Sequence, residues 1–176
     1  LKNQVKMSTK KQLFVYSYRV AGTVGLMMSK ILKVNDKLSL KRAIDLGIAM
    51  QLTNIARDVV EDKKRNRSYI DHNFNSIKET IEIADAFYKS SFSAIRAVPI
   101  GSRFSIIVAR RVYRKIGDNI LKQKNIENYD NAGKIYVSNV GKIIQTILSL
   151  YDFIRINFIN NKENLTEKEH LIINEE

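Results

Sequence analysis

The chain has 176 residues, no cysteine and one proline, and its 30 Lys and Arg against 18 Asp and Glu give a net charge of +12. The lack of cysteine excludes disulfides and thiolate metal sites. No apolar run reaches the ~18 residues of a membrane-spanning helix. Long stretches with apolar residues at helical spacing predict an all-α protein of one domain.

The excess of positive charge favours an anionic partner: a phosphorylated small molecule, an anionic lipid surface or a nucleic acid. The basic residues are spread along the chain, without zinc-finger spacing, an RNP-like aromatic motif or a compact helix-turn-helix pattern. We therefore expect no nucleic-acid binding. The alternative is a lysine-rich surface that only maintains solubility.

The first predicted helix runs from Leu13 to Lys33 and is apolar nearly all round, as a buried helix would be. It contains Gly22 and Gly25, each of which costs ~1 kcal/mol relative to alanine in a helix. Either another helix packs closely over these glycines, which we favour, or a ligand needs the space. Asn35 and Asp36 then end this helix and offer caps for the next one.

The second predicted helix, from about Ser39 to Asp62, carries the main functional signal. Gln51, Asn54, Asp58 and Asp62 follow at spacings of three, four and four, which places all four on one helix stripe. Two carboxylates and an amide oxygen are hard ligands of the kind that Mg²⁺ prefers. The alternative is solvated acids paired with the basic residues that come next. Polar groups on an otherwise apolar helix are costly unless paired, which favours a site.

Residues near this stripe could complete such a site. Gly47 lies on the same stripe, where a missing side chain would leave space above a metal ion. Arg57 could bind a phosphate oxygen in bidentate fashion. Four basic residues in the next polar loop could clamp a diphosphate, although screening of the acids is favoured for most of them: Lys63, Lys64, Arg65 and Arg67. His72 has no partner at ligand spacing and is assigned no role.

Two more helices are predicted in the middle of the chain. Ser76 and Glu79 are spaced as a capping box, which would open a helix that reaches about Ala97. The next helix spans about residues 102–123 and points Tyr113 inward. The hydroxyl of Tyr113 could face a phosphate, although an inward tyrosine is usually a core residue with a satisfied hydroxyl.

The C-terminal third is predicted as a short loop at residues 125–133 and a last long helix from Lys134 to about Asn160. This helix is strongly apolar. It is either a core helix or a helix whose apolar face lies on a membrane surface and admits an apolar substrate. Residues 160–176 are predicted to form a mobile acidic tail.

Three blocks, in this order, resemble the phytoene and squalene synthase family, in particular bacterial phytoene synthases: YSYRVAGTVGLMMSKI, LGIAMQLTNIARDVVEDKKRNRSYI and ARRVYRKIG. The resemblance implies an isoprenoid-synthase-type helical bundle, here an incomplete one of about five main helices. Residues 1–159 would be the C-terminal portion of a head-to-head trans-isoprenyl diphosphate synthase domain. The N-terminal half of such enzymes, with a further aspartate-rich motif, would be missing, and the chain alone would be incomplete.

The resemblance also implies roles for individual residues. The metal ligands would be Asn54, Asp58 and Asp62, and the catalytic residues that contact the diphosphate would be Arg57, Tyr113 and Lys134. Substrate-binding residues would line an apolar tunnel and its mouth, so that isoprenoid chains lie against the glycines of the first helix: Tyr16, Val20, Gly22, Val24, Gly25, Leu26 and Gln51.

The implied function is a Mg²⁺-dependent prenyltransferase, with Mn²⁺ as a substitute metal. It would condense two geranylgeranyl diphosphates head-to-head, through a cyclopropyl (prephytoene) diphosphate, to phytoene in carotenoid biosynthesis. One alternative is a squalene- or dehydrosqualene-type synthase that uses farnesyl diphosphate. An alternative of another class is a non-catalytic, membrane-associated assembly factor with the same fold.

The same resemblance implies a prenyl diphosphate substrate as the main partner. The apolar last helix leads us to expect peripheral contact with a membrane as well. We expect a cytoplasmic protein that contacts the inner face of the cell membrane. The sequence predicts no oligomeric state.

Overall fold

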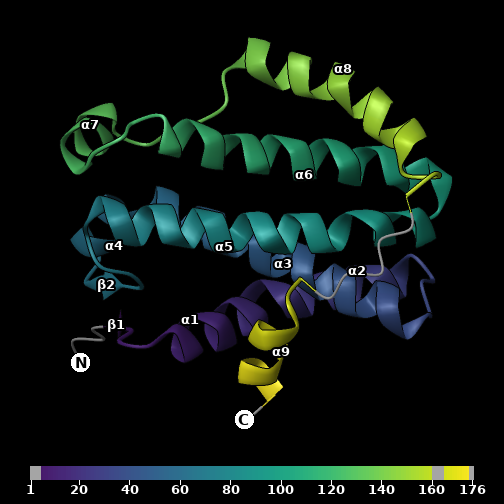
Figure 1. The fold of residues 1–176 in the computed structure, drawn as a ribbon, viewed down its shortest axis with the longest axis horizontal. Helices are drawn as coiled ribbons and strands as arrows, with labels where there is room; N and C mark the ends of the chain where they lie inside the picture. Colours follow the sequence, from purple (N-terminus) through teal and green to yellow (C-terminus); the bar gives the residue numbers. More distant parts are fainter. Residues whose placement is uncertain (1–4, 160–164, 175–176) are drawn as a thin grey trace.

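The computed structural model describes residues 5–159 and 165–174, which form an all-α bundle (Figure 1). Two short strands, β1 (Val5–Lys6) and β2 (Arg67–Ser68), pair in parallel. The helical elements are α1 (Lys10–Ser17), the π-helix η1 (Tyr18–Gly22), α2 (Thr23–Ile31), α3 (Lys37–Arg57), α4 (Val59–Lys64), α5 (Phe74–Phe92), the 3₁₀-helix η2 (Ser93–Ala97), α6 (Ile100–Leu121), α7 (Ile126–Ala132), α8 (Asn139–Arg155) and α9 (Glu167–Asn174).

Helix α3 lies at the centre of the bundle because its neighbours bury it on several sides. Ile48 and Leu52 of α3 are fully buried in a core cluster with Phe14 of α1 and Phe87 of α5. A second cluster joins the end of α3 and α4 to α5, α6 and α7, and a third joins α5, η2 and α6 to the end of α8. Figure 1 shows α8 as an outer layer against α6. The predicted all-α class is therefore confirmed.

The second predicted helix is observed as two helices, α3 and α4, with Asp58 between them. Asp36 caps α3, since its carboxylate accepts from the backbone N–H of Ser39 at 2.9 Å. At the junction, the N–H of Asp58 still donates to the carbonyl of Asn54 at 2.9 Å, and the N–H of Asp62 donates to the carbonyl of Asp58 at 2.8 Å. The one-turn spacing of these three residues is therefore kept across the break.

The consecutive helices α1, η1 and α2 form the first helical run, and two glycines let this run lie directly on α3. A Cβ built on Gly25 would lie 2.2 Å from the carbonyl oxygen of Ala43, and one on Gly47 would lie 2.2 Å from that of Ala21. The helix-packing interpretation of Gly25 is thus confirmed. The expectation that Gly47 leaves space above a metal ion is wrong, because its missing side chain admits the backbone of η1.

Helix α5 begins at Phe74, three residues before the expected start. The side chain of Asn73 caps it by accepting from the N–H of Ser76 at 2.8 Å. The predicted capping box of Ser76 and Glu79 is therefore wrong: Asn73 supplies the cap, and Glu79 instead forms an ion pair with Lys10 at 2.5 Å.

The expected loop at residues 125–133 is also corrected. It contains α7, which Asn125 caps by accepting from the N–H of Asn128 at 2.8 Å. Gly133 ends α7 with a φ of 63°, a conformation that favours glycine. Ser138 then caps α8, so the last long helix begins at Asn139 and not at Lys134.

Residues 165–174 differ from the expected mobile tail. They include α9, which packs on α1, and His170 and Ile173 of α9 are buried. The reason is specific contact: Ile173 joins the core cluster around Phe14, and His170 contacts a buried carboxylate. The rest of the tail, residues 160–164 and 175–176, lies outside the described residues. Within the described ranges, no helix is long and apolar enough to cross a membrane.

We predict that Gly25→Ala destabilises the protein, because the new Cβ would overlap the carbonyl oxygen of Ala43 and force two backbones apart. The expected loss is about 1–3 kcal/mol in the free energy of unfolding, measured by urea denaturation. The control is Gly101→Ala in α6, where nothing lies within 4 Å of the added Cβ. That variant should be as stable as the parent or slightly more stable, and equal effects at both positions would contradict the packing argument.

Candidate functional site

A polar cleft of about 210 Å³ lies where α1 meets the end of α3, α4 and the segment around β2. Seven of the residues singled out in the sequence line it: Tyr16, Gln51, Asn54, Arg57, Asp58, Asp62 and Arg67. Ile55 and Tyr69 complete the lining. The structure thus brings the oxygen donors of the α3 stripe together with basic and aromatic side chains in one cleft.

Asp58 and Arg57 are held together in this cleft. The Nε and Nη2 atoms of Arg57 donate to the two carboxylate oxygens of Asp58 at 2.8 and 2.7 Å. Lys134 adds a second cation, with its Nζ 3.4 Å from Asp58 Oδ1 and 2.7 Å from Glu61 Oε2. Burial acts to raise the pKa of Asp58, but the hydrogen bonds and charge of Arg57 outweigh it and lower the pKa below its ordinary value.

Asn54 and Asp62 line the cleft and carry oxygen atoms of the kind that bind a hard metal ion. The Oδ1 atom of Asn54 is buried and has no hydrogen-bond partner among the described residues. Burial, followed by the nearby charge of Asp58, raises the pKa of Asp62. An orphaned amide oxygen and two close carboxylates are the chemistry that a hard divalent cation satisfies.

The oxygen atoms of Asn54, Asp58 and Asp62 are therefore suitable donors for such an ion. Within the described ranges, no group of three or more His, Cys, Asp and Glu side chains could hold a metal. The candidate set consequently depends on the amide oxygen of Asn54 as its third protein donor. Asp58 would also have to exchange Arg57 for the ion.

Tyr69 and Arg67 are cleft residues that the sequence interpretation missed or undervalued. The rings of Tyr16 and Tyr69 stack with centroids 4.8 Å apart, and their hydroxyl oxygens lie 3.0 Å apart. Burial and this hydrogen bond raise the pKa of Tyr16 to about 12. Arg67 reaches the cleft from β2, which pairs with β1 near the start of the chain. In the sequence, Arg67 was one of four possible diphosphate clamps, and the only signal for Tyr69 was its position just after the carboxylates.

Tyr113 and Lys134 lie beside the cleft and are not among the residues that line it. Lys134 contacts the carboxylate of Asp58. Tyr113 is half-buried between the first two core clusters, and it is close enough to Arg57 to contribute to the raised pKa of that guanidinium. The ring of Tyr136 lies under Arg57, with 5.9 Å from the guanidinium carbon to the ring centroid.

An apolar cavity of about 360 Å³ lies between η1, α2, α3, η2 and α6. Val20, Val24 and Gly25, which were expected to line a tunnel, do line this cavity. Gly22 and Leu26 are not among its lining residues. A Cβ on Gly22 would meet the side chains of Ile44 and Tyr18 at 3.0 Å, so this glycine also serves close packing.

The cleft and the cavity follow the same face of α3. Asn54 lines the cleft, whereas Met50, Gly47, Ala43 and Ser39, spaced three or four residues apart, line the cavity. The first helical run repeats this order, with Tyr16 at the cleft and Val20 and Val24 at the cavity. An anionic head and an apolar tail of one ligand could therefore occupy the two spaces in sequence.

Tyr129 of α7 fixes the junction that carries Asp58. Its ring is buried, and its hydroxyl lies 2.8 Å from each of the carbonyl oxygens of Ala56 and Arg57, to which it donates. Burial raises the pKa of Tyr129 above its ordinary value. The sequence interpretation missed this residue because it placed Tyr129 in a loop.

Comparison with known proteins gives consistent matches. Residues 2–73 match the squalene/phytoene synthase family model. The 15-cis-phytoene synthase of Enterobacter agglomerans is 35% identical over 141 residues, which are 68% of this chain and 48% of that protein. The 15-cis-phytoene synthase of Pantoea ananas is 37% identical over 123 residues, which are 58% of this chain and 40% of that protein.

The fold has a solved counterpart in the crystal structure of a dehydrosqualene synthase in complex with a ligand. The TM-score is 0.70 at 27% identity, over 83% of this chain and 58% of that one. The predicted fold type is therefore confirmed. The chain spans about half the length of the curated relatives that it matches.

We predict that Tyr129→Phe loosens the junction between α3 and α4, because two carbonyl oxygens lose a buried donor while the ring stays in the core. The expected loss is about 1–2 kcal/mol in the free energy of unfolding, measured by urea denaturation. Tyr151→Phe, at an exposed position of α8, is the matched control and should leave stability unchanged. An unchanged Tyr129→Phe protein would show that this hydroxyl does not support the junction.

Proposed function

We propose that this chain, which belongs to the squalene/phytoene synthase family, supplies the diphosphate cleft and part of the apolar tunnel of a prenyltransferase. The whole protein would condense two geranylgeranyl diphosphates head-to-head, through prephytoene diphosphate, to phytoene in carotenoid biosynthesis. The observation that carries this proposal is the single face of α3 along which a polar, oxygen-rich cleft continues into an apolar cavity. The names of the relatives support the same reaction.

In this proposal, Asn54, Asp58 and Asp62 hold Mg²⁺, for which Mn²⁺ can substitute. The bound metal ion would supply Lewis-acid stabilisation of the diphosphate as the leaving group. Arg57 and Lys134 would bind diphosphate oxygens, and Tyr113 would add a hydroxyl contact. Arg67, which lines the cleft, is a further cation for the same anion.

The pairing of Arg57 with Asp58 supports coupled binding. In the structure Arg57, which we propose binds the diphosphate, is paired with Asp58, which we propose binds the metal ion. A metal ion that binds Asp58 alone would leave Arg57 without its carboxylate. A diphosphate that binds Arg57 alone would leave Asp58 without this guanidinium, and an unpaired buried charge is costly. Metal and diphosphate together would give each member a new partner, so we expect each to increase the affinity for the other.

The apolar cavity has a separate task in the proposed reaction. Ionisation of an allylic diphosphate creates a carbocation, which water would capture in an open site. The side chains of Val20, Val24, Leu46 and Met50 surround a space with few polar groups beside the cleft. They would form an apolar wall beside the reacting carbon and hold the isoprenoid tail extended along α3.

Catalysis is assigned to the whole protein, because the chain spans about half the length of its relatives. We expect the 176-residue chain to bind diphosphate in a Mg²⁺-dependent manner, with little or no turnover on its own. The test supplies the whole protein with geranylgeranyl diphosphate and Mg²⁺ and detects products by mass spectrometry. Absence of both phytoene and the cyclopropyl intermediate would reject this reaction, and absence of any condensation product from farnesyl diphosphate as well would favour a non-catalytic assembly factor.

The similarity in fold to a dehydrosqualene synthase favours farnesyl diphosphate as the second candidate substrate. A competition assay with equal amounts of farnesyl and geranylgeranyl diphosphate separates the two candidates. Phytoene as the main product supports the first candidate. Dehydrosqualene as the main product, or squalene when a hydride donor is added to the assay, supports the second.

We predict that Asp58→Asn lowers turnover of the whole protein by about 100-fold or more, because a metal donor loses its charge at the leaving group. In the 176-residue chain, it should also weaken the Mg²⁺-dependent binding of inorganic pyrophosphate, measured by calorimetry. Asp118→Asn, on the exposed side of α6, is the control for loss of one carboxylate. Unchanged activity in Asp58→Asn would refute the metal role.

We also propose that this protein is cytoplasmic and makes peripheral contact with the inner face of the cell membrane. The support is the outer face of α8 and the residues next to it, where large apolar side chains are exposed: Tyr136, Val140, Ile143, Ile144, Ile147, Leu148, Leu150, Tyr151, Ile154 and Phe158. Such a contiguous apolar face typically marks an interaction surface. The net charge of +12 favours anionic lipids.

We predict that Ile147→Glu reduces co-sedimentation with phosphatidylglycerol vesicles, because a charge is placed on the apolar face of α8. Ile100→Glu is the matched control, since Ile100 is also well exposed but lies at the start of α6. Equal loss for both variants would point to charge alone. No vesicle binding by the parent protein would reject the membrane contact.

A further inference from the structure

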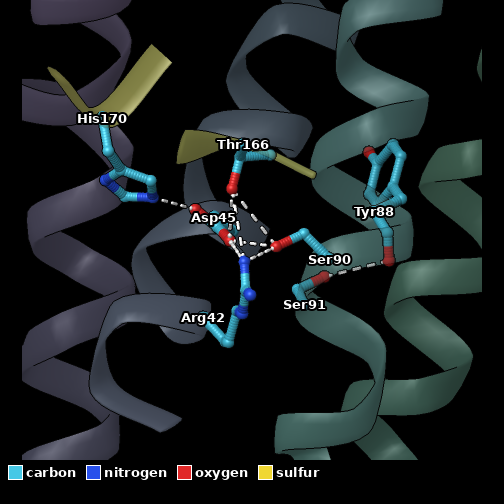
Figure 2. Close-up of polar contacts among 7 residues, drawn as sticks. All are labelled: Arg42, Asp45, Tyr88, Ser90, Ser91, Thr166 and His170. Carbon is cyan, nitrogen blue, oxygen red and sulfur yellow. Dashed lines mark hydrogen bonds and ion pairs between the residues drawn. The ribbon is translucent and has the colours of Figure 1, made fainter. Parts of the chain in front are cut away.

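The Asp45 cluster is a closed network of charged and polar side chains in the core, and none of its members lines the polar cleft (Figure 2). Asp45 Oδ2 accepts from Arg42 Nη1 at 3.1 Å. It also accepts from the hydroxyl groups of Ser90 and Thr166. Asp45 Oδ1 lies 2.5 Å from His170 Nε2. Both carboxylate oxygens are therefore occupied by side chains of the protein, and we assign this cluster a structural role.

The network beside the polar cleft is open and consists of alternating charges. It runs from the surface to the cleft through Arg65, Glu61, Lys134, Asp58 and Arg57. Glu61 Oε1 lies 2.7 Å from Arg65 Nη2, and Glu61 Oε2 lies 2.7 Å from Lys134 Nζ. The exposed fraction of the side chains falls from 62% at Arg65 to 13% at Arg57. Only Asp58 and Arg57 of this network line the cleft.

The backbone around Lys134 is fixed by contacts that do not involve its side chain. Ile135 and Val137, which follow it, are buried in the second core cluster. The direction of the Lys134 side chain instead depends on its two carboxylate contacts, Glu61 and Asp58. A lysine side chain has a flexible four-carbon stem, and holding it in one direction costs conformational entropy. These two contacts therefore decide whether the ammonium group stays at the cleft.

The two carboxylates differ in what they can do when ligands bind. In the proposed function Asp58 is a metal ligand, and a divalent cation there would repel the nearby ammonium group of Lys134. Glu61 has the shorter contact with Lys134, at 2.7 Å against 3.4 Å, and is not one of the proposed metal ligands. An ammonium group has three N–H donors. A hydrogen bond to Glu61 thus leaves two donors for diphosphate oxygens.

We propose that Glu61 is a positioning residue for the diphosphate: it holds the ammonium group of Lys134 beside the cleft when Asp58 is engaged as a metal ligand. Glu61 acts through Lys134 and has no contact with the diphosphate itself. This inference rests on the proposed function, in which Lys134 binds the diphosphate.

A positioning role has an effect opposite in direction to that of charge alone. Glu61 carries a negative charge close to the place where an anion would bind. Its neutralisation would by itself reduce repulsion and strengthen diphosphate binding. Loss of positioning would weaken diphosphate binding, because the flexible Lys134 side chain would then have to be ordered by the ligand. The direction of the change therefore separates the two effects.

The test is a double-mutant cycle on the 176-residue chain, in which the binding of inorganic pyrophosphate in excess Mg²⁺ is measured by calorimetry. Glu61→Gln should weaken pyrophosphate binding about fivefold. In the Lys134→Gln background the same change should not weaken binding further, because Glu61 acts through Lys134. Equal weakening in both backgrounds, or stronger binding by Glu61→Gln alone, would overturn the proposal.

Mn²⁺ binding without pyrophosphate, followed by electron paramagnetic resonance, shows whether Glu61 is instead a metal donor. A positioning residue predicts that Glu61→Gln keeps the Mn²⁺ affinity of the parent chain, whereas Asp58→Asn lowers it. A loss of Mn²⁺ affinity in Glu61→Gln as large as that in Asp58→Asn would make Glu61 a metal ligand and overturn the proposal.

Glu79→Gln is the matched control. Glu79 of α5 also forms an exposed ion pair with a lysine that is distant in sequence, Lys10, at 2.5 Å. Neither residue of this pair lines the polar cleft. The control variant should bind pyrophosphate like the parent chain. Equal weakening by Glu79→Gln and Glu61→Gln would show a general effect of carboxylate loss and would contradict the positioning role.

The parent chain separates this inference from the proposed function. Failure of the parent chain to bind pyrophosphate with Mg²⁺ would reject the proposed function, and the role of Glu61 with it. Binding by the parent chain together with additive effects of Glu61→Gln and Lys134→Gln would reject the role of Glu61 alone.

Discussion

The direct contact between the backbones of the first helical run and α3 determines the rest of the structure. Gly25 and Gly47 allow this approach, because any side chain at either position would overlap a carbonyl oxygen of the opposite helix. The same two helices carry the cleft at one end and the apolar cavity along their length. The widths of the cleft and of the apolar cavity therefore depend on a backbone contact at two glycines, which contribute no side chain to the site.

At the cleft, α3 ends and α4 begins, yet the backbone hydrogen bonds continue across this break. Asp58 leaves helical geometry, with φ at −104° and ψ at 16°, yet the amides of Asp58 and Asp62 still bond one turn back. Asn54, Asp58 and Asp62 can therefore face one cleft although two helices supply them. Tyr129 secures the break from α7, far along the chain.

The sequence predicted the features that depend on local periodicity. The stripe of Asn54, Asp58 and Asp62 was visible because helical spacing survives folding, and the all-α class came from the same pattern. Tyr69 enters the cleft beside β2, whose pairing with β1 is a tertiary contact without a periodic signal. The Asp45 cluster was equally invisible, since its contacts span more than a hundred residues. Helices α7 and α9 are short and polar, so they lacked a strong apolar repeat.

The π-helical turn η1 changes the direction in which the side chains of α2 point relative to those of α1. A π-helical ring contains one residue more than an α-helical ring, which rotates the residues after the turn by ~100° relative to an uninterrupted α-helix. Tyr16 before the turn can thus stack on Tyr69 while Gly25 after it meets Ala43. An insertion or deletion within Tyr18–Gly22 would rotate the residues of α2 about the helix axis relative to those of α1. The length of this short segment therefore sets which side of α2 faces α3.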